Sequence, residues 1–181
     1  MSRIGKLPIA IPAGITVEIN GQVVTAKNAK ETLSQEVSKN VTVKIEDNQI
    51  WVVRNDETSD SNAKQGLYRQ LISNMVVGLK DGFTKSLTVK GVGYKLNKQG
   101  NKLVMNLGLS HPVEVVEQDG VTFEIPDNNT ILVKGANKER VGAMAAKIRA
   151  TRPMEPYHGY GIHYTSEPVI LKAGKAAGKK K

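Results

Sequence analysis

The 181-residue chain contains no cysteine. Disulfide bonds, thiolate zinc sites and cysteine nucleophiles are therefore excluded, as suits a protein of the reducing cytosol. No segment approaches the ~20 apolar residues of a transmembrane helix, and the N-terminal stretch MSRIGKLPIAIPAG lacks the continuous apolar run of a signal peptide. These absences predict a soluble, intracellular protein.

Patterns of catalytic or metal-binding residues are also scarce. His158 and His163 are separated by two glycines rather than placed one helical turn apart, as a helical zinc site requires. No serine lies in a nucleophile elbow, and no pair of carboxylates stands out among 17 acidic residues. We therefore expect neither a metal nor a cofactor, and an enzyme is the weakest class of function.

Two glycine clusters, Gly91-Val92-Gly93 and Gly159-Tyr160-Gly161, lack the context of a phosphate-binding loop. The first lies inside a strand-like run, and the second follows a helix instead of preceding one. We interpret Gly91 and Gly93 as a β-bulge or as a close approach of the backbone.

Positive charge is concentrated at the C-terminal end. Residues 1–82 contain 10 Lys and Arg against 9 Asp and Glu (net +1), residues 83–133 contain 5 against 5 (net 0), and residues 134–181 contain 11 against 3 (net +8). Together these segments give the net charge of +9. A distribution this uneven indicates an oriented contact with a polyanion.

The segment Arg152–Tyr164, which reads RPMEPYHGYGIHY, has the composition of a rigid contact surface. Pro153 and Pro156 restrict the backbone, while Gly159 and Gly161 allow conformations that are closed to other residues. Between them stand aromatic and basic side chains, which can stack on bases and hydrogen-bond to phosphates. A plain surface loop is the alternative interpretation, and the basic surroundings favour contact with RNA.

Two segments about eighty residues apart are alike, VTVKIEDNQIWVV from Val41 and VTFEIPDNNTILV from Val121. Each predicts a strand, an Asp-Asn turn and a second strand, because apolar residues alternate with period two. We expect the likeness to extend to two more pairs of segments: LSQEV from Leu33 with LSHPV from Leu109, and ITVEI from Ile15 with LTVKGV from Leu87.

One amphipathic helix is expected after each hairpin. In the first helix, Asp60 or Ser61 can cap the N-terminus and Gly82 ends the helix. Its apolar stripe is predicted at Leu67, Leu71, Met75 and Leu79. The second helix is predicted to begin near Asn137, to end before Pro153, and to bury Val141, Ala145 and Ile148.

This pattern predicts an α+β fold made by duplication: two tandem similar domains, each an antiparallel sheet with one helix packed on one face. We expect the first domain at residues 1–82 and the second, RNA-binding domain at residues 83–171. The Ala/Gly/Lys composition of residues 172–181 predicts a basic, disordered tail.

Five motifs occur along the chain in a recognisable order: SRIGKLPIAIPAG at the start, KGVGYK from Lys90, LGLSHPV from Leu107, GAMAAKIR from Gly142 and RPMEPYHGYGI from Arg152. In this order they resemble the family of the sixth protein of the large ribosomal subunit, bacterial type, over essentially the whole chain. The resemblance implies two similar α+β domains, no enzymatic activity, a place on the cytoplasmic ribosome, and binding of large-subunit rRNA chiefly through the C-terminal domain. It also implies neighbouring ribosomal proteins and a position beside the sarcin-ricin loop, where translational GTPases dock.

The chain departs from that family within the Pro/Gly segment. Family members commonly read RPPEPYKGKGIRY, whereas Met154, His158, Tyr160 and His163 stand here in place of a proline, two lysines and an arginine. Up to three positive charges are thereby removed. Stacking by Tyr160 and contacts from the two histidines would replace part of what the cations do in relatives.

We expect the rRNA contacts to come from this segment, the second helix and the tail. The main candidates are Arg149, Arg152, Tyr157, His158, Tyr160, His163, Lys172, Lys175, Lys179, Lys180 and Lys181. The second group of candidates is Lys134, Lys138, Arg140 and Lys147. Two other classes stay open. The rigid segment argues against a nucleic-acid-binding protein without sequence preference, and the +8 C-terminal end argues against a bare protein-interaction module.

Overall fold

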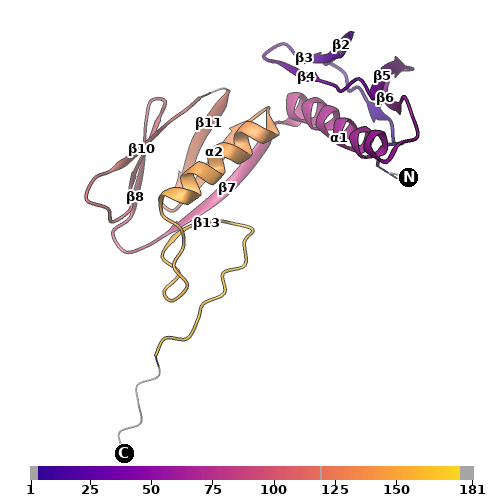
Figure 1. Ribbon diagram of the computed structural model, residues 1–181. Helices are drawn as coiled ribbons and strands as arrows, with labels where there is room; N and C mark the ends of the chain where they lie inside the picture. The colour runs from indigo at the N-terminus through magenta and orange to yellow at the C-terminus, as the bar shows by residue number, and fades with distance from the viewer. Residues whose placement is uncertain (1–3, 119, 176–181) are drawn as a thin grey trace, which may run out of the picture. The chain divides into compact units, whose positions relative to one another are not determined.

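The computed structural model describes residues 4–118 and 120–175, and the chain divides into two compact units. The first unit consists of Met1–Phe83 with Ala136–Lys138, and the second of Thr84–Gly135 with Glu139–Lys181. Antiparallel sheets and a helix make up each unit (Figure 1). The predicted α+β class, with two similar halves, is confirmed.

The first unit contains two three-stranded sheets, where the sequence predicted one sheet. One sheet has the order β2-β3-β4, and the other has the order β1-β6-β5. The strands are β1 (Ile9–Ala10), β2 (Thr16–Asn20), β3 (Val23–Lys27), β4 (Thr32–Glu36), β5 (Val41–Glu46) and β6 (Gln49–Arg54). Helix α1 (Ser59–Asp81) packs against strands of both sheets, and Val24, Ile50 and Ile72 lie almost fully buried in the shared core.

The start of α1 differs from the prediction. Its N-cap is Thr58, whose side-chain oxygen accepts a hydrogen bond from Ser61 N at 3.3 Å, whereas Asp60 and Ser61 both lie within the helix. The predicted end is confirmed. Gly82 has a φ of 72°, and its N–H donates to Gly78 O at 3.0 Å.

The buried face of α1 also differs from the predicted stripe. Leu67 is 54% exposed. The buried residues of the helix are Ser61, Gln65, Ile72, Met75, Val76, Gly78 and Leu79. A helix has 3.6 residues per turn, so residues spaced by four advance about 40° beyond a full turn at each step. The predicted stripe therefore drifts around the helix, and only its C-terminal members, Met75 and Leu79, reach the core.

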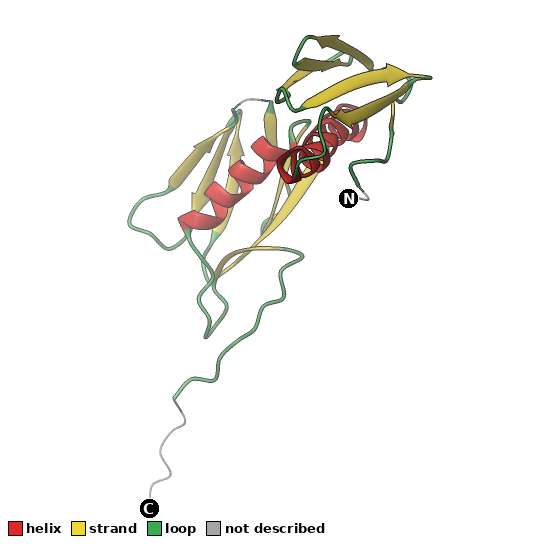
Figure 2. Ribbon diagram, turned by 45° about the vertical axis from the view of Figure 1, so that its right-hand side comes forward, coloured by secondary structure: helices red, strands yellow, loops and turns green. Residues whose placement is uncertain are grey.

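The second unit has a three-stranded sheet of order β10-β9-β8 and a four-stranded sheet of order β11-β12-β7-β13. The strands are β7 (Phe83–Lys90), β8 (Lys95–Gln99), β9 (Lys102–Asn106), β10 (Val113–Val116), β11 (Val121–Asp127), β12 (Thr130–Gly135) and β13 (Gly161–Tyr164). Figures 1 and 2 both show α2 (Lys138–Thr151) lying along one face of the strands of this unit. Val141, Ala145 and Ile148 are its buried residues, as predicted.

The internal duplication is visible in matching backbone contacts. Val37 N donates to Gln22 O at 2.7 Å in the first unit, and Glu117 N donates to Asn101 O at 2.8 Å in the second. The hairpins β2-β3 and β8-β9 also turn at glycines of similar φ, 62° at Gly21 and 59° at Gly100. Strands β2, β3 and β4 thus correspond to β8, β9 and β10, and β5-β6 corresponds to β11-β12.

This correspondence corrects both additional matches expected from the sequence. The strand after Ile15 is β2, which corresponds to β8 and not to the strand containing Leu87. The LSQEV segment lies mainly in β4 and corresponds to residues 113–117, while LSHP precedes β10. The connection before β10 (residues 107–112) is longer than the connection before β4 (residues 28–31). The sequence comparison therefore paired LSQEV with residues that mostly precede β10.

Two turns also differ from their predicted form. In the first hairpin the turn residues are Asp47 and Asn48, as predicted, but in the second they are Asn128 and Asn129. The Gly91–Gly93 cluster forms the turn between β7 and β8 and does not lie inside a strand. The expected close approach is present at Gly91, where a Cβ atom would lie 2.4 Å from the ring of Tyr94. Among the described residues, neither helix combines the length and apolar content that a membrane span requires.

Candidate nucleic-acid interface

The predicted contact segment begins as a loop between the end of α2 and β13, which we call the 152–160 loop. Two backbone hydrogen bonds close it: Ile162 N donates to Arg152 O at 2.8 Å, and Glu155 N donates to Tyr160 O at 2.8 Å. Pro153 and Ile162 also form an isolated bridge. Because Pro153 cannot continue the helix, the chain leaves α2 and returns to the edge of the sheet as β13.

Gly161 is required at the base of this loop. Its φ is 135°, and a Cβ atom there would lie 2.5 Å from Met154 Cα and 2.6 Å from Pro153 O. Gly159 is buried at a φ of 73°, and a Cβ atom there would lie 3.1 Å from Leu171 Cδ2. Both glycines allow the loop to pack closely against neighbouring backbone and side chains.

The chain after β13 returns to the 152–160 loop. Lys172 N donates to Pro156 O at 2.8 Å. A groove then forms between the loop and the C-terminal segment, and it is lined by Tyr157, His158, Lys172, Ala173, Gly174 and Lys175. Four of the main candidates for RNA contact therefore meet in one place, although they come from two stretches of sequence.

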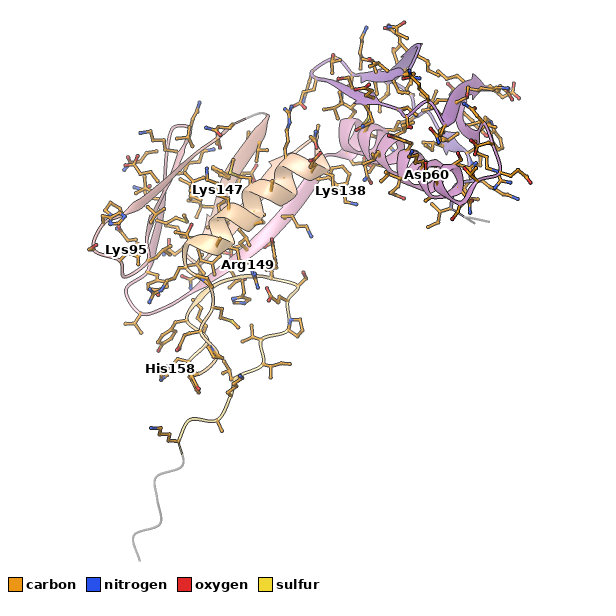
Figure 3. The ribbon with its side chains drawn as sticks, in the orientation of Figure 1. Asp60, Lys95, Lys138, Lys147, Arg149 and His158 are labelled. Carbon is orange, nitrogen blue, oxygen red and sulfur yellow. The ribbon has the colours of Figure 1, made fainter. Side chains whose placement is uncertain are left out.

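His158 is the most constrained aromatic side chain of the loop. Its ring stacks on that of Tyr160, with centroids 5.6 Å apart and planes at 18°. Its Nδ1 lies 2.9 Å from Glu155 Oε1, and its backbone N–H donates to the same oxygen at 2.8 Å. This backbone hydrogen bond is the main reason that the pKa of Glu155 is lowered from its usual value, and the carboxylate in turn holds the turn at His158. In Figure 3, His158 lies on the loop that extends beyond α2.

Arg149, another of the main candidates, is half-buried and is held by contacts within the second unit. Its Nη2 donates to Glu167 Oε1 at 2.7 Å, and its guanidinium group lies 5.5 Å from the centroid of the Tyr164 ring. The hydrogen bond from Arg149 lowers the pKa of Glu167. Arg149 thus ties α2 to the turn after β13. Lys147, two residues earlier on α2, is exposed.

The other predicted contact residues differ in how exposed their side chains are. Arg152, Tyr157 and Tyr160 are exposed, whereas His163 is half-buried on β13, and its Nδ1 is buried without a hydrogen-bond partner among the described residues. Lys172 and Lys175 are exposed. Lys179, Lys180 and Lys181 lie outside the described residues.

The second group of cations does not converge on the loop. Lys134 forms an ion pair with Glu124 between β12 and β11 at 2.5 Å. Lys138 lies within the first unit, with its Nζ 5.6 Å from the centroid of the Phe83 ring. Arg140 and Lys147 line a shallow pocket with Gln118 and Val121 on another part of the second unit. Figure 3 labels Lys138, Lys147 and Arg149 on α2.

Sequence reasoning missed Lys90 as a neighbour of the loop. Lys90 pairs with Gly161 in the β7-β13 ladder, and its Nζ would lie 3.9 Å from a Cβ atom at Gly159. The residue lies in the KGVGYK motif, about sixty residues before the loop, and only the strand pairing brings the two together. Within residues 4–118 and 120–175, no group of three or more His, Asp or Glu side chains could hold a metal ion.

Comparison with known proteins agrees with this organisation. The model of the family described as "Ribosomal protein L6" matches residues 11–82 and 90–165, one match in each half of the chain. Three similar proteins are each named "Large ribosomal subunit protein uL6". They come from Desulfitobacterium hafniense (51% identity over 180 residues, 99% of this chain and 98% of the relative), Listeria monocytogenes (51% over 175 residues, 97% and 98%) and Clostridium acetobutylicum (49% over 176 residues, 97% and 98%).

Proposed function

This chain belongs to the ribosomal protein L6 family, and from that premise we propose that its second unit anchors it to large-subunit rRNA through the 152–160 loop and the C-terminal lysines. Family membership makes the chain a structural constituent of the large ribosomal subunit and places it on the cytoplasmic ribosome. The family is not enzymatic, which confirms the expectation that this chain has no catalytic activity.

The observation that carries the proposal is the meeting of the loop and the C-terminal segment. Lys172 N and Pro156 O join the two stretches at 2.8 Å, and this places the exposed lysines beside Tyr157 and His158. The same region belongs to the part of the sequence that carries the net +8. A fixed arrangement of cations and aromatic rings can make phosphate contacts and base contacts together, which a flexible basic tail alone does not offer.

The first unit is proposed to face solvent or neighbouring ribosomal proteins, because residues 1–82 have a net charge of only +1.

We include in the proposal a position beside the sarcin-ricin loop and the docking site of translational GTPases. Its support is the order of motifs along the chain, which resembles the family from the N-terminus to the Arg152–Tyr164 segment. Chemical probing of the rRNA in subunits with and without the protein tests this position, and protection of nucleotides elsewhere alone contradicts it.

Charge reversal in the two units tests the assignment of RNA anchoring. We compare Arg152→Glu, Lys172→Glu and Lys175→Glu, combined in one full-length protein, with Lys6→Glu, Lys30→Glu and Lys39→Glu combined in another. All six side chains are exposed, so both proteins lose the same amount of positive charge without loss of core packing.

The second-unit protein is expected to bind a large-subunit rRNA fragment at least about tenfold more weakly. The slope of log K against log salt should fall by up to about 2.7, since each phosphate contact contributes about 0.9. The first-unit protein should change far less. Equal losses in the two proteins would mean that attraction depends only on net charge. A random DNA duplex at the same salt concentration measures binding without sequence preference.

A further inference from the structure

The groove between the 152–160 loop and the C-terminal segment, which we call the loop–tail groove, is anchored by two contacts between its walls. The hydrogen bond from Lys172 N to Pro156 O joins them at one end. Gly159 packs against Leu171, where even a Cβ atom would come within 3.1 Å of the leucine side chain. The groove has a volume of about 590 Å³, within the usual range for sites that hold a small molecule or one group of a larger ligand.

One wall of the groove is aromatic and held in place. His158 is stacked on Tyr160 and bound to Glu155 through Nδ1, so its ring is oriented before any ligand arrives. Tyr157 lies on the same wall and is 54% exposed. An oriented ring loses little conformational entropy when a second ring stacks on it. The wall therefore favours a flat, unsaturated ligand.

The other wall carries positive charge. Lys172 and Lys175 line it, and neither ammonium group forms an ion pair within the described part of the chain. Both are therefore available to an anion. A nucleotide joins a flat base to a phosphate, so its two parts match the two walls. Bases inside a duplex are stacked on one another, and only an unpaired base can offer its face to a side chain.

Resting on the rRNA-binding function proposed above, we propose that the loop–tail groove binds one unpaired RNA nucleotide, with its base stacked against His158 and Tyr157 and its phosphates held by Lys172 and Lys175. The base contact carries little sequence preference, because every base has a π face. His158 acts here through its ring and not through its charge.

The test uses the full-length protein with a fluorescently labelled single-stranded RNA hexamer, a blunt RNA duplex with the same number of phosphates, and a nucleoside monophosphate. Variants His158→Phe and His158→Leu are compared by fluorescence anisotropy over a range of salt concentrations, and circular dichroism checks that each variant is folded. The phenylalanine keeps a ring without an ionisable group, and the leucine keeps only apolar volume.

The phenylalanine variant should bind the hexamer within about twofold of the unchanged protein. The leucine variant should bind about 5- to 150-fold more weakly, which is the loss expected for one stacked base, with an unchanged salt slope. Lys172→Gln should lower the salt slope by about 0.7, the value for one phosphate of a single strand. Lys102→Gln on β9 serves as its control and should leave the slope within error. Ring protons of Tyr157 and His158 should shift upfield when the hexamer binds.

Four results would overturn the nucleotide site. They are no loss of binding in either variant, equal losses in both variants, tighter binding of the duplex than of the hexamer, and failure of the nucleoside monophosphate, in excess, to displace the hexamer. Each of them is compatible with salt-dependent rRNA anchoring by the second unit. A loss of that anchoring would appear instead in the charge-reversal comparison, so the two proposals fail separately.

Discussion

Gly161 is required for two reasons, its positive φ and the lack of space for a Cβ atom, and the sequence alone does not show the second. A positive φ could be tolerated by some residues at a modest energetic cost, but Met154 and the carbonyl oxygen of Pro153 occupy the space of any Cβ atom. The resulting contacts, 2.5 and 2.6 Å, involve backbone atoms that cannot rotate away. The return of the chain from the 152–160 loop into β13 therefore depends on this glycine.

We expect Gly161→Ala to destabilise the second unit by about 2–4 kcal/mol, because both backbone strain and overlap must be relieved. Gly142→Ala is the matched control. Gly142 lies in α2, nothing lies within 4 Å of the added Cβ atom, and the higher helix propensity of alanine should stabilise the protein by about 0.5–1 kcal/mol. Urea unfolding of the full-length variants measures both effects. A Gly161→Ala protein as stable as the parent would contradict the packing at the base of the loop.

The structure distinguishes two candidates for RNA contact that the sequence does not separate. Arg149 and Arg152 are three positions apart and look equivalent in the sequence. In the structure Arg149 is paired with Glu167 and lies over Tyr164, while Arg152 is exposed. Their difference comes from Glu167, which lies 18 residues after Arg149, and no local pattern marks that partner.

Among the structural elements, β8 and β11 of the second unit are joined by a polar contact that has no counterpart among the described residues of the first unit. Lys98 Nζ donates to Glu117 Oε1 and to Phe123 O, each at 2.7 Å, and Phe123 N donates to Glu117 Oε1 at 2.6 Å. Apolar residues occupy the corresponding places in the first unit. Ile19, like Lys98, stands second from the end of its strand, and Val37 matches Glu117 through its backbone hydrogen bond.

Removing one side chain of the Lys98–Glu117 pair should lower the free energy of unfolding by more than the net contribution of the pair, because the other charged side chain stays partly buried. Glu117 is only 13% exposed and Lys98 is 36% exposed. We therefore expect Lys98→Met to destabilise the second unit by about 1–3 kcal/mol. The control, Lys102→Met, breaks the exposed ion pair with Glu114 and should change stability by less than about 0.5 kcal/mol. The double variant Lys98→Ile and Glu117→Val copies the first unit and should be more stable than Lys98→Met. Chemical denaturation decides both points.

The same contact predicts a dependence of stability on pH. Burial alone raises the pKa of Glu117, but hydrogen bonds from Lys98 and Phe123 outweigh it, so the pKa is lowered from 4.5. A depressed pKa in the folded state stabilises the fold at pH values above the unfolded-state pKa, and this contribution is lost as pH falls through the folded-state value. The second unit should therefore lose stability below about pH 4.5, and Glu117→Gln should reduce that loss. Thermal unfolding between pH 3 and 7 measures the change, and identical profiles would remove Glu117 from the acid response.

The two helices show what could be predicted from sequence at this scale. For α2, the apolar residues Val141, Ala145 and Ile148 recur at spacings of four and three, which marks one face of the helix, and the prediction was correct. In α1, apolar residues also occupy solvent-facing positions, so a stripe through Leu67 was as regular in the sequence as the true face. Strand matches between the halves were misplaced for a related reason. Hairpins of alternating residues look alike, and only backbone pairing fixes which strands correspond.

At the scale of the whole molecule, duplication preserved the fold while charge diverged. Both halves keep two small sheets and a helix, yet residues 134–181 carry a net charge of +8 and residues 1–82 carry +1. This difference in charge led to the proposal that the C-terminal end of the chain meets RNA. Composition could not predict the groove, because a hydrogen bond between Lys172 and Pro156, and the pairing of Lys90 with Gly161, depend on the folded chain.

The C-terminal lysines give the last prediction, which concerns how binding energy is divided along the chain. A protein that ends at Gly174 loses Lys175, Lys179, Lys180 and Lys181 but keeps Lys172 and its hydrogen bond to Pro156. If all four lysines contact phosphates, the slope of log K against log salt for an rRNA fragment should fall by up to about 3.6. Stability should stay the same, since Lys175 is exposed and forms no ion pair among the described residues.

The shortened protein should still distinguish the rRNA fragment from a random duplex, because Arg152, Tyr157, His158 and Lys172 remain in place. Affinity and specificity would then be separable: the lysines beyond Gly174 strengthen binding to any polyanion, whereas the 152–160 loop selects the site. Titrations of both nucleic acids at three salt concentrations measure the two quantities together. If the shortened protein bound both nucleic acids equally, selection would depend on the removed lysines, and the loop would have only a structural role.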